Sequence, residues 1–128
     1  MKEAIRRFDP AGEFYTPEKC YIIELSNTPA DPDVSIARAR VEAGVTTRWH
    51  RVAGITERYV ILEGQGRVEV GTLPAAEVAA GDVVLIPASC PQRIGNIGTV
   101  DLIFLAICSP RFRIEAYEDI EATPRNTE

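Results

Sequence analysis

Residues 44–64 read GVTTRWHRVAGITERYVILEG, and this stretch carries the pattern that decides the fold. Apolar and polar residues tend to alternate along it, instead of recurring every three or four positions as they would on a helix. Successive side chains of a strand point to opposite faces of a sheet, so a period of two indicates half-buried β-strands. The stretch therefore predicts two strands, at 46–52 and 58–62, separated by a turn at Gly54.

The same pattern continues on both sides of this stretch. Further short runs rich in apolar and β-branched residues predict strands at 21–25, 34–41, 67–70, 83–86 and 102–107. Gly64-Gln65-Gly66 predicts a hairpin loop between two strands, because glycine readily adopts the positive φ of a tight turn. Only the end segments 2–8 and 114–120 favour short helical or irregular structure. Short strands that recur in this way predict one all-β sandwich or barrel.

The composition limits the class of protein. The chain has 128 residues, of which 45% are hydrophobic and 26% charged, so we predict one folded domain over 1–128, with a barrel core at about 20–108. A net charge of -5 disfavours a nucleic-acid backbone as partner. The longest apolar run, 102–108, is too short to cross a bilayer, and residues 1–10 lack the apolar stretch of a secretory signal. Three widely spaced cysteines favour neither a disulfide framework nor a zinc knuckle, so we predict a cytoplasmic protein without a nucleic-acid or membrane partner.

His50 is the single histidine of the chain and limits the chemistry that the protein can perform. Alternation puts Arg48 and His50 on one face of their strand, and Glu57 and Tyr59 on one face of the next. If both faces point inward, His50 meets Glu57. An imidazole beside a carboxylate can bind a divalent ion, act as an oriented base, or form a hydrogen-bonded pair with only a packing role. The spacing alone leaves these three alternatives open.

Two blocks of the sequence resemble the two motifs of the cupin superfamily. The first block is 44–64 and the second is 81–96, GDVVLIPASCPQRIGN, in the order that the family has them. The positions that agree are Gly44, His50, Glu57 and Gly64 in the first block, and Gly81, Pro87 and Asn96 in the second. The resemblance implies a small single-domain cupin, a double-stranded β-helix or jelly-roll-like barrel that takes up nearly the whole chain.

The departures from the motifs concern the residues that would bind a metal. Metal-binding cupins carry three histidines and one glutamate, of which this chain keeps His50 and Glu57. Val52 stands at the second histidine position and cannot bind a metal, whereas Gln92 stands at the third and offers an amide oxygen. The resemblance thus implies a divalent-metal site of reduced histidine content, formed by His50, Glu57 and Gln92. Manganese, iron, nickel, copper or zinc could occupy it, and the alternative is a degenerate site without metal.

The resemblance implies a small molecule as partner, with or without turnover. The first hypothesis is a metal-dependent cupin that performs oxygenase, isomerase or lyase chemistry on a small polar or anionic molecule. Glu57 and Tyr59 would be its catalytic residues, and Arg48, Tyr59 and Gln92 would contact the substrate. The alternative is a non-catalytic cupin that binds a sugar or a carboxylate. A third hypothesis resembles epimerase-type cupins, with His50 as base and Tyr59 as acid and no metal.

Three further expectations concern the remainder of the chain. Cupin barrels of this size usually pair through edge strands, which predicts a homodimer. Cys90 and Cys108 are expected as small buried hydrophobic residues, although Cys90 lies close enough to Gln92 to approach the barrel mouth. Phe112 and Tyr117 are expected to cover apolar surface near the strand ends.

Overall fold

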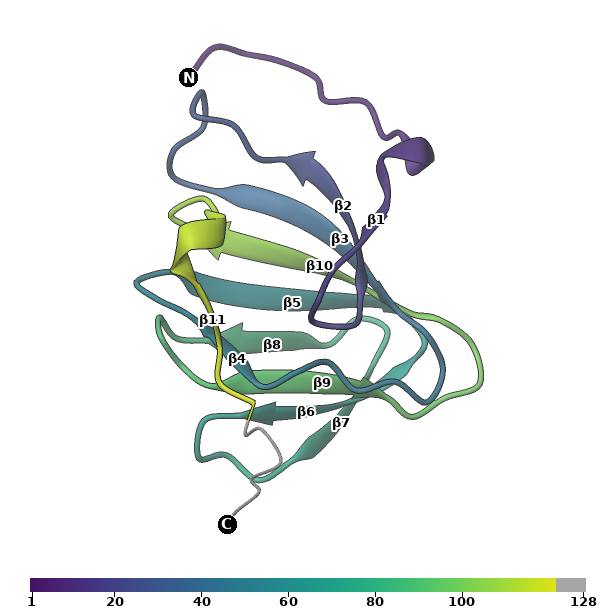
Figure 1. The fold of residues 1–128 in the computed structure, drawn as a ribbon. Helices are drawn as coiled ribbons and strands as arrows, with labels where there is room; N and C mark the ends of the chain where they lie inside the picture. Colours follow the sequence, from purple (N-terminus) through teal and green to yellow (C-terminus); the bar gives the residue numbers. More distant parts are fainter. Residues whose placement is uncertain (122–128) are drawn as a thin grey trace.

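The computed structural model describes residues 1–121, which form two antiparallel β-sheets that face each other (Figure 1). The strands are β1 (Phe14–Tyr15), β2 (Tyr21–Ser26), β3 (Ser35–Val41), β4 (His50–Val52), β5 (Thr56–Glu63), β6 (Gln65–Val70), β7 (Ala76–Ala79), β8 (Val83–Ile86), β9 (Gln92–Asn96), β10 (Leu102–Ser109) and β11 (Tyr117–Asp119). One sheet has six strands in the order β1-β2-β3-β10-β5-β8, and the other has five in the order β11-β4-β9-β6-β7. The all-β, jelly-roll-like architecture predicted from the sequence is confirmed, although within the described residues the two sheets do not join into one closed barrel.

Most predicted strands are present, but the first strand of motif one is shorter than its pattern indicates. The strand predicted at 46–52 begins only at His50, and Thr46 makes an isolated bridge to Gly95. The Thr47 side-chain hydroxyl accepts a hydrogen bond from the Ile94 backbone N–H at 3.0 Å. The Thr47 hydroxyl thus replaces a backbone carbonyl as the acceptor for Ile94. The regular alternation of inward and outward side chains therefore does not extend from β4 back to residue 47.

Gly64 is a corner between the sheets, and the hairpin predicted at Gly64-Gln65-Gly66 is wrong. β5 belongs to the six-stranded sheet and β6 to the five-stranded sheet, so these consecutive strands are not hydrogen-bonded neighbours. Gly64 has a φ of +86°, and a Cβ atom there would lie 2.6 Å from the backbone oxygen of Asp101. The glycine is therefore needed for its positive φ and for the close approach of a second backbone.

Gly64→Ala should lower the free energy of unfolding by about 2 to 4 kcal/mol, because it combines a left-handed conformation with a backbone clash. Gly54→Ala is the matched control, since Gly54 also has a positive φ, +71°, but open space around the position of its Cβ. It should cost only about 1 kcal/mol. Urea unfolding of both variants measures the difference, and equal losses would contradict the clash.

The short ends of the chain differ from the helical expectation. Within 2–8 no regular element forms, and the first turn of 3-10 helix is η1 (Pro10–Gly12). In 114–120 a second 3-10 turn, η2 (Ile114–Ala116), leads directly into β11. β11 pairs with β4, so the tail completes the sheet that carries His50.

The core lies between the two sheets. Its largest fully buried side chains come from both of them and are Ile61, Ile86, Ile94, Leu102, Gln92 and Val41. Phe112 packs on a smaller cluster of Val52, Ile55 and Cys108, which confirms the packing role expected of Phe112. All three cysteines are free, and Cys108 is buried as expected, whereas Cys90 is half-buried.

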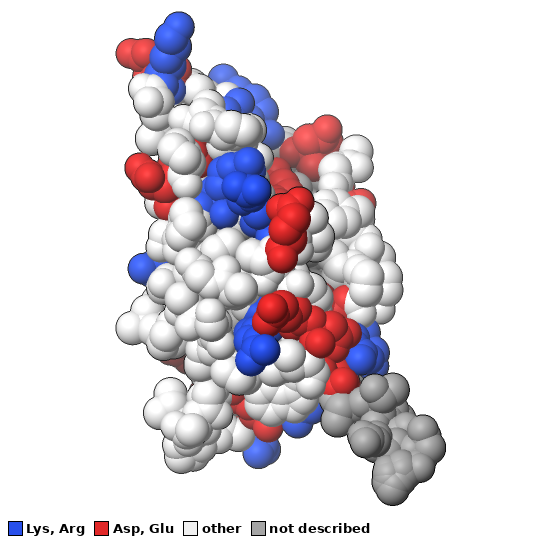
Figure 2. All heavy atoms as spheres, turned by 60° about the vertical axis from the view of Figure 1, so that its left-hand side comes forward, with Lys and Arg blue, Asp and Glu red and all other residues white. Residues whose placement is uncertain are grey.

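The surface is charged but mixed in sign. On the face drawn in Figure 2, acidic and basic side chains alternate and no large basic patch appears. In the part of the chain that the structure describes, no helix is long and apolar enough to cross a membrane.

Candidate functional site

A large cavity opens between the β1–β2 hairpin and the segment 111–117. Its volume is about 860 Å³, and Glu57 and Cys108 from the six-stranded sheet are among the residues that line it. A second cavity of about 40 Å³ lies further in, lined among others by His50 and Tyr59. We call them the outer and the inner cavity. They share one boundary, here called the floor, formed by Glu18, Ile22, Glu57, Ala106, Phe112 and Tyr117.

His50 lies at the start of β4, with 3% of its side chain exposed. Its Nδ1 lies 2.8 Å from the backbone oxygen of Arg48. A carbonyl oxygen can only accept, so Nδ1 carries the proton, and in the neutral ring the lone pair is on Nε2. Nε2 lies 3.8 Å from Glu18 Oε2, and the ring of Tyr117 stacks on the imidazole with centroids 5.2 Å apart. The histidine is thus held in one tautomer, with its basic nitrogen toward the floor.

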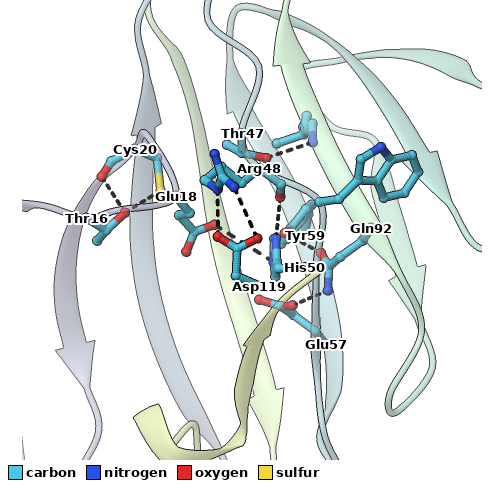
Figure 3. A network of polar contacts seen from close by, with 12 residues as sticks. Thr16, Glu18, Cys20, Thr47, Arg48, His50, Glu57, Tyr59, Gln92 and Asp119 are labelled. Carbon is cyan, nitrogen blue, oxygen red and sulfur yellow. Dashed lines mark hydrogen bonds and ion pairs between the residues drawn. The ribbon is translucent and has the colours of Figure 1, made fainter. Parts of the chain in front are cut away.

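Glu57, Gln92 and Tyr59 form one buried chain of hydrogen bonds (Figure 3). Gln92 Nε2 donates to Glu57 Oε1 at 2.8 Å, and the Tyr59 hydroxyl donates to Gln92 Oε1 at 2.5 Å. Burial raises the pKa of Glu57, and the hydrogen bond from Gln92 partly opposes this rise. Tyr59 also has a raised pKa, because it is buried beside Glu57. The amide of Gln92 therefore connects the phenol to the carboxyl group and fixes both.

Glu18 is a site residue that the sequence analysis missed. It lies in the loop between β1 and β2, and 21% of its side chain is exposed. Burial raises its pKa to about 7. Its own backbone oxygen accepts from Arg48 N–H at 3.2 Å, and Lys19 beside it has a φ of 75°. No period in 16–20 signals this placement, since the loop conformation brings the carboxyl group to His50.

Tyr117 has more than the packing role expected from the sequence. It lines both cavities in addition to stacking on His50. Its hydroxyl is buried without a hydrogen-bond partner among residues 1–121. Burial raises the pKa of this phenol. A buried hydroxyl without a partner is costly, so the floor offers a polar atom that a bound molecule can satisfy.

Arg48 and Gln92 do not line the two cavities, although both were expected to contact substrate. Arg48 pairs instead with Asp119 at the surface, with Nε 2.6 Å from Oδ2. β4 begins at His50, so the alternation used to place Arg48 on the inner face does not extend to residue 48. The fold does bring His50, Glu57, Tyr59 and Gln92 together in the interior, Tyr59 and His50 at the inner cavity.

The donor set does not fit the three-ligand metal site implied by the motifs. Gln92 uses its amide oxygen for Tyr59 and its amide nitrogen for Glu57. Val52 contributes only an apolar side chain to the inner cavity. Over residues 1–121, no group of three or more His, Cys, Asp or Glu side chains is placed to hold a metal ion. Both ends of the Gln92 amide are thus engaged within the hydrogen-bonded chain.

Comparison with known proteins agrees with this fold. The family model of the cupin domain matches residues 37–108. The uncharacterized protein MJ1618 of Methanocaldococcus jannaschii is 32% identical over 123 residues, which cover 94% of this chain and 98% of that protein.

Two solved structures extend the comparison. KdgF from a Halomonas species has a TM-score of 0.75 at 15% identity, over 88% of this chain and 98% of that one, which shows the fold alone. A predicted oxalate decarboxylase from Thermotoga maritima has a TM-score of 0.65 at 27% identity, over 71% and 80%. Since the family model spans both motif blocks and the strands between them, the chain belongs to the cupin family.

Proposed function

We propose that this cupin binds a small polar organic molecule in the outer cavity and moves a proton on it, as an isomerase or lyase does. The observation that carries the proposal is the orientation of His50, whose Nδ1–H is held by a backbone carbonyl. An imidazole fixed in this way presents Nε2 as an oriented general base.

The two carboxyl groups of the floor complete the proton-transfer site. A carboxyl group with a pKa of about 7, such as that of Glu18, is protonated in a large fraction of molecules at neutral pH and exchanges its proton readily. Glu57 lines both cavities and is the second acid–base candidate. In this proposal Glu18 and Glu57, which line the outer cavity, act on the substrate, and His50 exchanges a proton with Glu18, whose Oε2 lies 3.8 Å from the imidazole Nε2.

Tyr59 and Gln92 act as positioning residues in this proposal. Of the two cavities, Tyr59 lines only the inner one, and its hydroxyl donates a hydrogen bond to Gln92 Oε1. Gln92 in turn holds Glu57 Oε1. The pair therefore fixes the carboxyl group of Glu57 and leaves the contact with substrate to the floor.

Hydrogen exchange tests the proposal without knowledge of the natural substrate. The protein is incubated in D2O with a panel of small hydroxy, keto and amino compounds, and C–H exchange is followed by NMR. We expect at least one compound to exchange with the native protein and exchange to be lost in His50→Gln. Thr28→Ala, which alters a loop outside both cavities, is the control that should keep the exchange. If compounds bind but none exchanges its C–H hydrogens, the proposed proton transfer is wrong and the non-catalytic cupin is favoured.

The metal prediction has its own test. Untagged protein purified without chelator should contain far less than one equivalent of manganese, iron, nickel, copper or zinc, because Gln92 is already engaged by Tyr59 and Glu57. Plasma mass spectrometry measures the content before and after soaking with each ion. A near-stoichiometric metal that is lost in Gln92→Ala would restore the site of His50, Glu57 and Gln92.

The homodimer and the cytoplasmic location stay predictions. The edge strand β8 exposes Val83 and Leu85, with 56% and 69% of their surface accessible, and such an edge favours pairing with a second copy. Light scattering after gel filtration should give twice the mass of one chain.

A further inference from the structure

The floor of the cavity holds two carboxyl groups, and no Lys or Arg among residues 1–121 belongs to it. Among the described residues, arginines pair with other acids, such as Glu13, Glu69 and Asp119. Glu18 lies 3.8 Å from the imidazole of His50 and also meets the Cys20 thiol. Glu57 accepts from the amide of Gln92 and lies close to His50 and the Cys108 thiol. An anionic group at this floor would therefore face two acids and, within residues 1–121, no Lys or Arg side chain.

The two arginines that line the outer cavity do not change this balance. Arg113 lies 3.5 Å from Glu115 near the solvent, with 65% of its side chain exposed. Arg111 donates to Asn27 Oδ1 at 2.9 Å. Both come from the segment after β10, and neither lines the inner cavity.

The walls of the outer cavity are largely aromatic and apolar. The aromatic side chains that line it are Phe14, Tyr15, Phe112 and Tyr117. Aromatic faces and carboxylates together are the usual surroundings of an organic cation, since the ring quadrupole and the negative charge both attract it. A volume of about 860 Å³ is in the range of pockets that take small organic molecules.

We infer that the ligand of this cavity presents a protonated primary amine to the floor, with its carbon skeleton against the aromatic walls. The inference rests on the proposed function, because it names the substrate class of the same site. An ammonium group has three donors, and the floor offers three oxygen acceptors, on Glu18, Glu57 and Tyr117. The amine thus satisfies the Tyr117 hydroxyl and brings one positive charge to the two acids. A carboxylate brings no donor, and an alcohol brings one.

Three probes of nearly equal shape test the inference, namely benzylamine, benzyl alcohol and benzoate. Isothermal titration calorimetry at neutral pH measures their affinities for the full chain. Benzylamine should bind at least about tenfold more tightly than benzyl alcohol, because charge-assisted hydrogen bonds replace a neutral one, and benzoate should bind most weakly.

Two variants assign the preference to the floor. Glu18→Gln keeps the shape of the side chain and should reduce the affinity for benzylamine about tenfold while it leaves benzyl alcohol nearly unchanged. Glu77→Gln, at an exposed position of β7 outside both cavities, should change neither. Circular dichroism verifies that both variants fold.

The outcomes separate the inference from the proposed function. Benzylamine that does not bind, or binds no more tightly than benzoate, overturns the inference, as does an unchanged preference in Glu18→Gln. If benzyl alcohol still binds and the C–H exchange that depends on His50 persists, the proposed function remains and only the amine preference is wrong. If no compound binds and none exchanges, both fail.

Discussion

Gln92→Leu should lower the free energy of unfolding by about 3 kcal/mol, although it replaces a polar core residue by an apolar one of similar size. Gln92 is 1% exposed and holds two buried groups at once. Its loss leaves the Tyr59 hydroxyl without an acceptor and Glu57 Oε1 without its donor. Unsatisfied buried polar groups cost more than the new apolar contact returns. Urea unfolding followed by circular dichroism measures the loss.

A double-mutant cycle identifies the cause of this loss. Tyr59→Phe removes the orphaned hydroxyl, so Gln92→Leu should cost at least about 1 kcal/mol less in the Tyr59→Phe background than in the native protein. Strictly additive losses would show that the hydrogen bond between Tyr59 and Gln92 contributes nothing. Leu102→Ala, a buried apolar truncation elsewhere in the core, should lose stability without coupling to Tyr59→Phe beyond about 0.5 kcal/mol.

The free energy of unfolding should fall as the pH rises from about 5 to about 8, and Glu18 should account for about 2 to 3 kcal/mol of that fall. Its pKa is raised from 4.5 to about 7 in the folded chain. Between these values the folded state holds more protons than the unfolded state. The stability from this group is therefore fully present below pH 4.5 and is lost as the pH rises through about 7.

Comparison with Glu18→Gln isolates this effect, since glutamine does not titrate. Between about pH 5 and about pH 8, the free energy of unfolding of the variant should fall by about 2 to 3 kcal/mol less than that of the native protein. The acids whose pKa is lowered by arginine partners, Glu13, Glu69 and Asp119, titrate below this window and do not contribute. Glu57 also has a raised pKa and leaves a residual slope of the same sign in the variant. Equal slopes in both proteins would mean that the carboxyl group of Glu18 is solvated.

Local pattern was sufficient for the strands whose two faces have different surroundings. In β5 the buried Tyr59 and Ile61 alternate with the less buried Arg58 and Val60, and this alternation is visible in the sequence. β9 contains Gly95 and Asn96, which locally favour a turn, and its burial comes from neighbouring strands. The short edge strands β7 and β11 likewise depend on their partners, so no local signal predicts them.

The candidate site was predictable only where it lies on the two motif blocks. Alternation brought His50 and Glu57 together, and the resemblance to the cupin motifs added Gln92. β4 and β9 bring His50 and Gln92 into direct register. Glu18 lies far from both blocks, and tertiary contacts with the chain around Arg48 determine its position. The orphaned hydroxyl of Tyr117 is a property of the assembled interior, which composition and periodicity do not describe.

The pairing of β11 with β4 also affects the order in which a growing chain can complete its cavity. β4 meets β9 through the single pair His50↔Gln92, whereas β11 supplies three partners on its other side, including Asp119 for His50. On the ribosome, residues 14–109 are made before β11, so β4, which carries His50, can pair with β9 before it can pair with β11. The sandwich can collapse early, but the imidazole acquires its stacked tyrosine only when residues 117–119 have emerged. Binding competence therefore follows core formation, and a released chain that ends before residue 117 should keep the two-sheet core but lack the ring that stacks on His50.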